Sequence, residues 1–127
     1  MTIAGLGTYD PDNIFARILR GEIPATVVFE DEHVVAFNDI APRAPQHVLV
    51  VPRGPYVSFA DFVKRASHDE VCGFFRAVGL VAAQLGLDAP GYRMLSNVGE
   101  HGGQEVPHFH VHLFGGRPLG PMLVSPG

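Results

Sequence analysis

Short runs of apolar, β-favouring residues recur along this chain, and turn-forming residues separate them. Runs of this length and composition predict β-strands. The predicted strands cover residues 25–30, 33–38, 47–52, 92–97 and 108–114. Asp31 and Glu32 alone separate the first two runs, a spacing that predicts an antiparallel hairpin.

One long stretch has a helical period instead. Apolar residues between 69 and 85 recur every three or four positions, which predicts an amphipathic helix. Ser67 and Glu70 fit a capping box at its start, and Gly86 fits a stop at its end.

Two shorter helices are predicted, at 13–19 and at 58–64. Asp10 or Asp12 is the expected cap of the first of them. Because strands outnumber helices and short turns join several of them, we predict an α+β fold. Its core would be a five-stranded, mainly antiparallel sheet with two main helices.

Length and composition set the domain organisation. A chain of 127 residues with 46% hydrophobic residues is long enough to bury the core of one domain. Residues 1–11 are predicted to be a flexible leader with little to pack, followed by a single domain over 12–127. The leader lacks the basic and apolar segments of a secretory signal, and no apolar run approaches the ~20 residues of a membrane span.

Charge and cysteine content exclude several functions. With 13 acidic and 9 basic residues the net charge is −4, which argues against nucleic-acid or anionic-membrane binding but leaves room for one small anionic ligand. Cys72 is the single cysteine, so neither an internal disulfide nor a cysteine-based zinc site can form. We expect a cytoplasmic protein.

Three histidines at alternate positions carry the strongest chemical signal. His108, His110 and His112 are separated by Phe109 and Val111, so a strand would place all three imidazoles on one face. Neighbouring histidines would lie roughly 6.6 Å apart along the strand. Four of the seven histidines of the chain fall between residues 101 and 112.

Two kinds of chemistry fit such a cluster. Imidazoles at this spacing can converge on zinc, with His47 or His101 as a further ligand, although few carboxylates lie nearby in the sequence. Alternatively, the cluster acts on phosphate, since imidazole supplies both a neutral nucleophile and a cationic donor. Two imidazolium ions at this spacing repel by roughly 2.5 kcal/mol at an effective dielectric of 20, so we expect at least one neutral ring in the empty site.

The residues around the cluster favour phosphate. The loop Gly102-Gly103-Gln104 runs directly into the histidine strand and offers backbone N–H groups to an anion. Asn97 can add a side-chain amide, and Asp39, at the end of a strand, can accept ribose hydroxyl groups. His47 is expected to be buried in a supporting role. His33 and His68 are expected to be exposed, and Cys72 is expected to be a small packing residue.

The segment His108–Phe114 resembles the motif His-φ-His-φ-His-φ-φ of the histidine triad (HIT) superfamily, where φ is an apolar residue. The resemblance covers roughly residues 12–123 and includes Ala36–Pro42 and His47–Pro52. The C-terminal Leu119-Gly120-Pro121-Met122 is similar to the bacterial form of the Hint branch, the nucleoside phosphoramidases.

This resemblance implies hydrolysis of the P–N bond of adenosine or guanosine 5′-phosphoramidates to a nucleoside monophosphate and an amine. His110 would be the nucleophile, with its other ring nitrogen held by the backbone carbonyl of His108, and His112 would donate a proton. His47 would support His108 from behind. The resemblance implies no metal or other cofactor.

It also implies the nucleotide contacts and a homodimer. The dimer interface would form from the 69–85 helix and the 92–97 strand. Residues implied to bind phosphate oxygens are Asn97, Gly103, Gln104 and the backbone of Glu105. Residues implied to bind the nucleoside are Asp39 at the ribose and Ile40 and Phe15 at the base.

The chain departs from the family pattern in two places. Many members have a hydroxyl residue where this chain has Glu105, and a carboxylate cannot donate to phosphate. The chain also lacks tryptophan and therefore the tryptophan-containing tail of the animal members. Alternatives to the phosphoramidase are a dinucleoside polyphosphate hydrolase, a non-catalytic purine-nucleotide-binding module and a zinc hydrolase.

Overall fold

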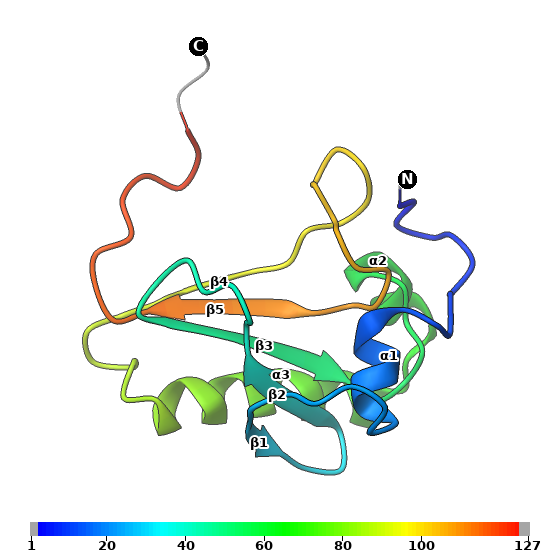
Figure 1. The fold of residues 1–127 in the computed structure, drawn as a ribbon, viewed down its shortest axis with the longest axis horizontal. Helices are drawn as coiled ribbons and strands as arrows, with labels where there is room; N and C mark the ends of the chain where they lie inside the picture. Colours follow the sequence, from blue (N-terminus) through cyan, green and yellow to red (C-terminus); the bar gives the residue numbers. More distant parts are fainter. Residues whose placement is uncertain (1–2, 125–127) are drawn as a thin grey trace.

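A computed structural model describes residues 3–124 of the chain (Figure 1). Within them, five strands form one sheet in the order β1-β2-β3-β5-β4, and every neighbouring pair is antiparallel. This confirms the predicted α+β fold and its five-stranded antiparallel sheet. The strands are β1 (Val27–Glu30), β2 (Val34–Asn38), β3 (Gln46–Pro52), β4 (Arg93–Leu95) and β5 (Val111–Gly115).

Over residues 3–124, three helices accompany the sheet: α1 (Ile14–Leu19), α2 (Phe59–Arg65) and the long α3 (His68–Gln84). The predicted capping box is present at α3, where Ser67 and Glu70 each accept the backbone N–H of the other.

The start of α1 corrects the sequence prediction. Asn13 caps the helix by accepting the N–H of Ala16 at 2.9 Å. Asp10 does not cap it, because its carboxylate accepts the N–H of Asp12, also at 2.9 Å. Gly21 follows the helix with φ +76°, a conformation that glycine adopts without strain.

Alternation along the strands gives the sheet two buried faces. One face packs on α3 and the other on α1, as the period of two requires. Strand residues on the α3 face are Val34, Ala36, Val48, Val50, Val111 and Leu113. Strand residues on the α1 face are Val35, Phe37, Leu49 and Val51, against Phe15. Since His112 pairs with Leu49 across the β3–β5 ladder, it shares the α1 face.

The histidine segment joins the sheet later than predicted. The β5 ladder begins at Val111 rather than at 108. Residues 108–110 bond to loops instead, since the N–H of Phe109 donates to the carbonyl of Tyr56 at 2.7 Å and the carbonyl of His110 accepts the hydroxyl of Ser96 at 2.7 Å. The segment is therefore tied to the connections preceding α2 and following β4.

Three local predictions are wrong. Tyr9 and Gly5 of the predicted leader do pack: the Tyr9 hydroxyl bonds to His108, and the Gly5 carbonyl accepts the hydroxyl of Ser58. His33 is not an exposed residue, because its side chain is only 25% exposed and lies against α3. Cys72 is exposed rather than packed, and its sulfur accepts from Arg76. The leader's mobility and the domain boundary after residue 11 stay predictions.

Candidate active site

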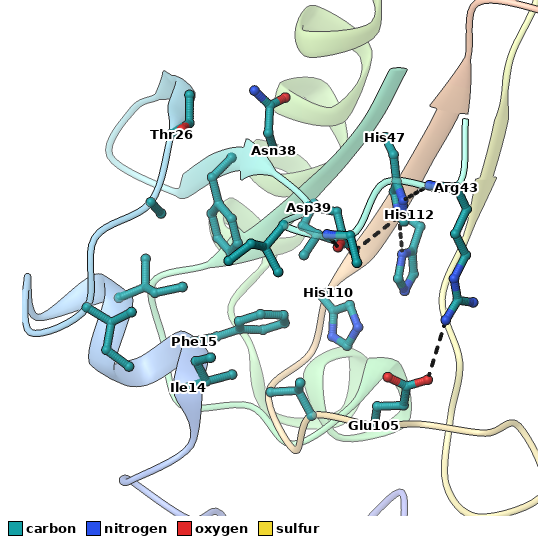
Figure 2. Close-up of a pocket in the computed structure, with 18 of the residues that line it drawn as sticks. Ile14, Phe15, Thr26, Asn38, Asp39, Arg43, His47, Glu105, His110 and His112 are labelled. Carbon is teal, nitrogen blue, oxygen red and sulfur yellow. Dashed lines mark hydrogen bonds and ion pairs between the residues drawn. The ribbon is translucent and has the colours of Figure 1, made fainter. Parts of the chain in front are cut away.

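A cavity of about 600 Å³ opens on the α1 face of the sheet (Figure 2). One end is apolar, and the other contains the titratable side chains. The apolar lining includes Ile14, Phe15, Ile18, Ile23, Phe37 and Leu49. The polar lining includes Asp39, Arg43, His47, Glu105, His110 and His112. Further predicted residues on the lining are Ile40, Asn97 and Gly103, whereas His108 and Gln104 are absent from it.

His110 faces the cavity, and one of its ring nitrogens is already hydrogen-bonded to the backbone. Its Nδ1 lies 2.7 Å from the carbonyl oxygen of His108, the hydrogen bond that the family resemblance implied. A carbonyl only accepts, so Nδ1 carries the proton and Nε2 keeps its lone pair. The ring of Phe15 packs edge-on against His110, with centroids 4.9 Å apart. The backbone therefore holds His110 in the tautomer that a nucleophile needs.

His112 takes the opposite tautomer, and a chain of hydrogen bonds from the backbone fixes it. The N–H of Arg43 donates to His47 Nδ1 at 3.2 Å, so a neutral His47 carries its proton on Nε2. That Nε2 lies 2.9 Å from His112 Nδ1, which must then accept. The proton of His112 is left on Nε2, as a donor.

This arrangement corrects the role expected for His47. It is buried, as predicted, but supports His112 and not His108. Asp39 also belongs to this group, because its carboxylate lies 3.4 Å from His47 Nε2 and accepts the N–H of Ala41 at 2.8 Å.

His108 is a buried structural histidine. Its Nε2 donates to the carbonyl of Pro52 at 2.9 Å, and its Nδ1 accepts the hydroxyl of Tyr9 at 2.7 Å. Burial, opposed by the Pro52 hydrogen bond, lowers the pKa of His108 to about 4. Sequence analysis missed Tyr9, because no short-range pattern connects it to a residue 99 positions away.

The remaining imidazoles of the site are also held neutral. Burial is the main cause that lowers the pKa of His110, of His112 and of His47. For His112 the neighbouring His110 and His47 add to this effect, and its pKa falls to about 4. The sequence-based expectation of a neutral ring in the empty site is therefore met by all of these histidines at pH 7.

The glycine loop contradicts the prediction for Gln104. Its side-chain amide donates to the carbonyls of Val57 at 2.7 Å and Val106 at 3.0 Å, and its oxygen accepts the N–H of Gly99. Its backbone N–H donates to Gly99, so both kinds of donor are used inside the protein. Gln104 thus braces the loop rather than facing the cavity. The N–H of Gly103 is likewise used, by the carbonyl of Glu100.

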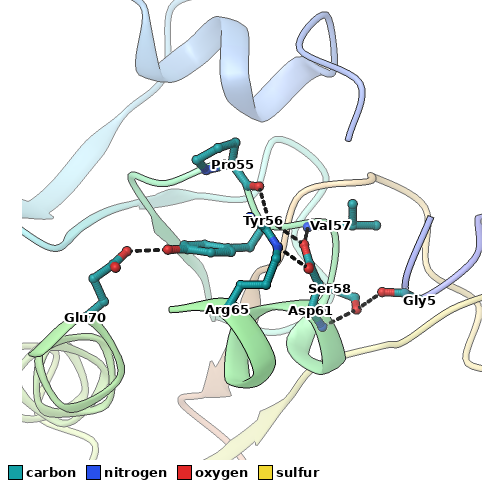
Figure 3. A network of polar contacts seen from close by, with 8 residues as sticks. All are labelled: Gly5, Pro55, Tyr56, Val57, Ser58, Asp61, Arg65 and Glu70. Carbon is teal, nitrogen blue, oxygen red and sulfur yellow. Dashed lines mark hydrogen bonds and ion pairs between the residues drawn. The ribbon is translucent and has the colours of Figure 1, made fainter. Parts of the chain in front are cut away.

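A polar network holds the loop around Tyr56, whose carbonyl accepts the N–H of Phe109 in the histidine segment (Figure 3). Asp61 of α2 accepts the N–H of Val57 at 2.8 Å and forms an ion pair with Arg65. The hydrogen bond from Arg65 is the main cause that lowers the pKa of Asp61. The Tyr56 hydroxyl donates to Glu70 of α3 at 2.6 Å, and burial and this carboxylate raise the pKa of Tyr56 to about 12. Through these contacts the loop that receives the N–H of Phe109 is anchored to both helices.

One group of side chains has the composition of a metal site. Potential ligand atoms of Asp39, His47 and His112 lie within 4.8 Å of one another. A metal requires a lone pair on His47 Nε2, but the N–H of Arg43 occupies Nδ1 and places the proton on Nε2. The tautomers imposed by the backbone therefore suit a hydrogen-bonded relay better than a metal centre.

Glu105, on the lining of the cavity, points toward Arg43 (Figure 2). Its Oε1 lies 3.9 Å from Arg43 Nη2, and both side chains are largely exposed.

In the described part of the chain, no helix is both long and apolar enough to cross a bilayer.

Comparison with known proteins identifies the family of this chain. Residues 20–119 match the model of the HIT domain. The chain is 60% identical to an uncharacterized 13.2 kDa HIT-like protein of Azospirillum brasilense, covering 93% of this chain and 97% of that protein. It is 44% identical to the purine nucleoside phosphoramidase of Escherichia coli K12, covering 91% and 97%.

Solved structures give the same result. A histidine triad protein from Clostridium difficile superposes with a TM-score of 0.81 at 40% identity, covering 91% of this chain and 100% of that one. The family model matches most of the chain, and the relatives cover nearly all of it. This chain therefore belongs to the HIT family.

Proposed function

We propose that this protein hydrolyses purine nucleoside 5′-phosphoramidates, with His110 as the nucleophile. The observation that carries the proposal is the pair of opposite tautomers at one end of the cavity. His110 has a lone pair on Nε2, while His112 has a proton on Nε2. A nucleophile and a donor side by side are what cleavage of a P–N bond requires.

The first step would form a bond between His110 Nε2 and the α-phosphorus and break the P–N bond. The leaving nitrogen takes a proton through His112, so the His47–His112 pair must carry one additional proton in the substrate complex. The bound phosphate and Asp39, 3.4 Å from His47 Nε2, both favour that proton.

Water completes the reaction. It attacks phosphorus, the P–Nε2 bond breaks and returns the electron pair to His110, and the His47–His112 pair accepts the proton of the water. The products are a nucleoside monophosphate and the free amine. The carbonyl of His108 keeps Nδ1 protonated in both steps, which directs each bond change to Nε2.

The shape of the cavity supports a nucleoside substrate. Its apolar end, with Phe15 and Phe37, is suited to a flat purine, and Asp39 lies between that end and the histidines, where a ribose would accompany the base. The name of the E. coli relative, a purine nucleoside phosphoramidase, supports the same substrate class. Asn97, also on the lining, would donate its side-chain amide to the phosphate, whereas the N–H of Gly103 is already used by the carbonyl of Glu100.

The test is release of AMP from adenosine 5′-phosphoramidate by His110→Ala. We expect turnover to fall by about 10³-fold or more, because the covalent step is lost. His68→Ala, at an exposed position at the start of α3, is the matched control and should keep wild-type turnover. Near-normal turnover by the His110 variant would refute the assignment.

Three further measurements separate the alternatives. Faster turnover of a dinucleoside polyphosphate than of the phosphoramidate would favour the polyphosphate hydrolase. Tight AMP binding by an enzyme that turns over neither substrate would favour a binding module. Stoichiometric zinc, lost together with activity on chelation, would favour a zinc hydrolase.

We also propose that the protein is a homodimer. β4 is at one end of the sheet, and the exposed apolar side chains of Met94 and Leu80 belong to β4 and α3. Sedimentation equilibrium would measure the mass, and a monomer at micromolar concentration would contradict this proposal.

A further inference from the structure

The charges on the cavity lining are unfavourable for an anionic substrate. Among the described lining residues, Asp39 and Glu105 are anionic and Arg43 is the one permanent cation. The histidines do not compensate in the empty site, since burial favours their neutral forms. A phosphoramidate carries a negative charge, and the charge on its phosphoryl oxygens increases during nucleophilic attack. The phosphate therefore needs a cation from the protein.

Arg43 is located where it can supply that charge. Its backbone N–H bonds to His47, which places the residue at the histidine end of the cavity. Figure 2 shows its side chain running past His112 toward Glu105, with Phe15 and Ile14 at the far side of His110. A nucleotide with its base among the apolar residues would bring its phosphate and leaving group to the guanidinium.

The contact that holds Arg43 in the empty site is weak. Its Nη2 lies 3.9 Å from Glu105 Oε1, and the two side chains are 75% and 79% exposed. Exposed pairs of this kind contribute little to stability, so separating them is easy. A phosphate, by contrast, offers two oxygens that match the fork of N–H donors on a guanidinium.

We propose that Arg43 transfers from Glu105 to the phosphate when a nucleotide binds, and that it stabilises the phosphoryl charge as a permanent cation beside the protonated His47–His112 pair. Glu105 holds the guanidinium in the free protein and competes with the phosphate for it. This inference rests on the proposed function for the identity of the anion, although it concerns binding as well as turnover.

The experiment is calorimetric titration with AMP at low ionic strength. Arg43→Gln removes the charge and should weaken AMP binding about tenfold, whereas Arg43→Lys should retain most of the affinity. Arg76→Gln, on α3 behind the opposite face of the sheet, removes an equal charge and should have little effect. These variants separate a local contact from the change in net charge.

Glu105→Gln tests the competition. It should strengthen AMP binding about threefold when Arg43 is present, because the guanidinium is released and a repulsive carboxylate is lost. In the Arg43→Gln background only the loss of the repulsive carboxylate remains, so the increase in AMP affinity should be smaller. Equal gains in both backgrounds would overturn the proposed pairing.

Other outcomes are equally decisive. Wild-type affinity in Arg43→Gln, or an equal loss in Arg43→Lys and Arg43→Gln, would overturn the cationic role while leaving the proposed function intact. If the variants show the expected affinities but the wild type does not cleave a phosphoramidate, the proposed function fails and the role of Arg43 in binding stands.

Discussion

The buried imidazole of His108 makes the stability of this protein depend on pH in a way that one substitution can isolate. The folded protein holds the ring neutral between Pro52 and Tyr9, with its pKa lowered from 6.5 to about 4. Because the folded-state pKa lies below the unfolded one, the unfolded chain binds the proton first as pH falls. The contribution of His108 to stability is thus complete above pH 6.5 and is lost as pH falls toward 4.

The size of this effect follows from the two pKa values. At pH 4.5 the unfolded histidine is almost fully protonated and the folded one largely is not. The difference destabilises the folded state by about 2–3 kcal/mol relative to pH 7.5. This is a large part of the total stability of a typical domain.

His108→Gln removes the titration but keeps one donor and one acceptor. Its amide N–H can donate to Pro52 and its oxygen can accept from Tyr9. We expect the variant to be less stable at pH 7.5 by about 1–3 kcal/mol, because neither hydrogen bond keeps its geometry. Between pH 7.5 and 4.5, however, it should lose about 2–3 kcal/mol less than the wild type.

Urea unfolding at several pH values measures both quantities. Every other ionisable side chain is present in both proteins, so its contribution cancels in the comparison. Equal losses of unfolding free energy in wild type and variant would show that His108 does not resist protonation in the folded state, and would refute the reasoning.

Two further predictions concern the residues whose roles the structure corrected. His47→Phe should lower kcat about tenfold or more and change AMP affinity less than threefold, because phenylalanine fills the space of the imidazole but lacks the N–H that sets the tautomer of His112. An unchanged kcat would exclude a catalytic role for the His47–His112 hydrogen bond. Gln104→Leu should lower the free energy of unfolding by about 2–3 kcal/mol, because it leaves the N–H of Gly99 and two carbonyls without their partner; thermal unfolding measures this, and unchanged stability with weaker AMP binding would instead restore Gln104 to the phosphate site.

Much of the architecture follows from local sequence patterns. The period of two placed His110 and His112 on the α1 face, and the capping box fixed the start of α3. The boundaries of the short elements were less accurate. Asn13 caps α1 in place of the predicted Asp10. The β5 ladder starts at Val111 and not at the predicted residue 108, because Phe109 bonds to a loop and not to a strand. In both cases a competing hydrogen bond decided the boundary.

The sequence by itself determined which residue types meet at the site, because alternation and spacing are properties of neighbouring residues. Tertiary structure decided what each histidine can do. The proton positions on His108 and His112 depend on Pro52, Tyr9 and His47, which lie 56, 99 and 65 residues away along the chain. Whether an imidazole nitrogen donates or accepts is set by the partner that faces it, and only the register of β3 against β5 and the path of the loops bring those partners together.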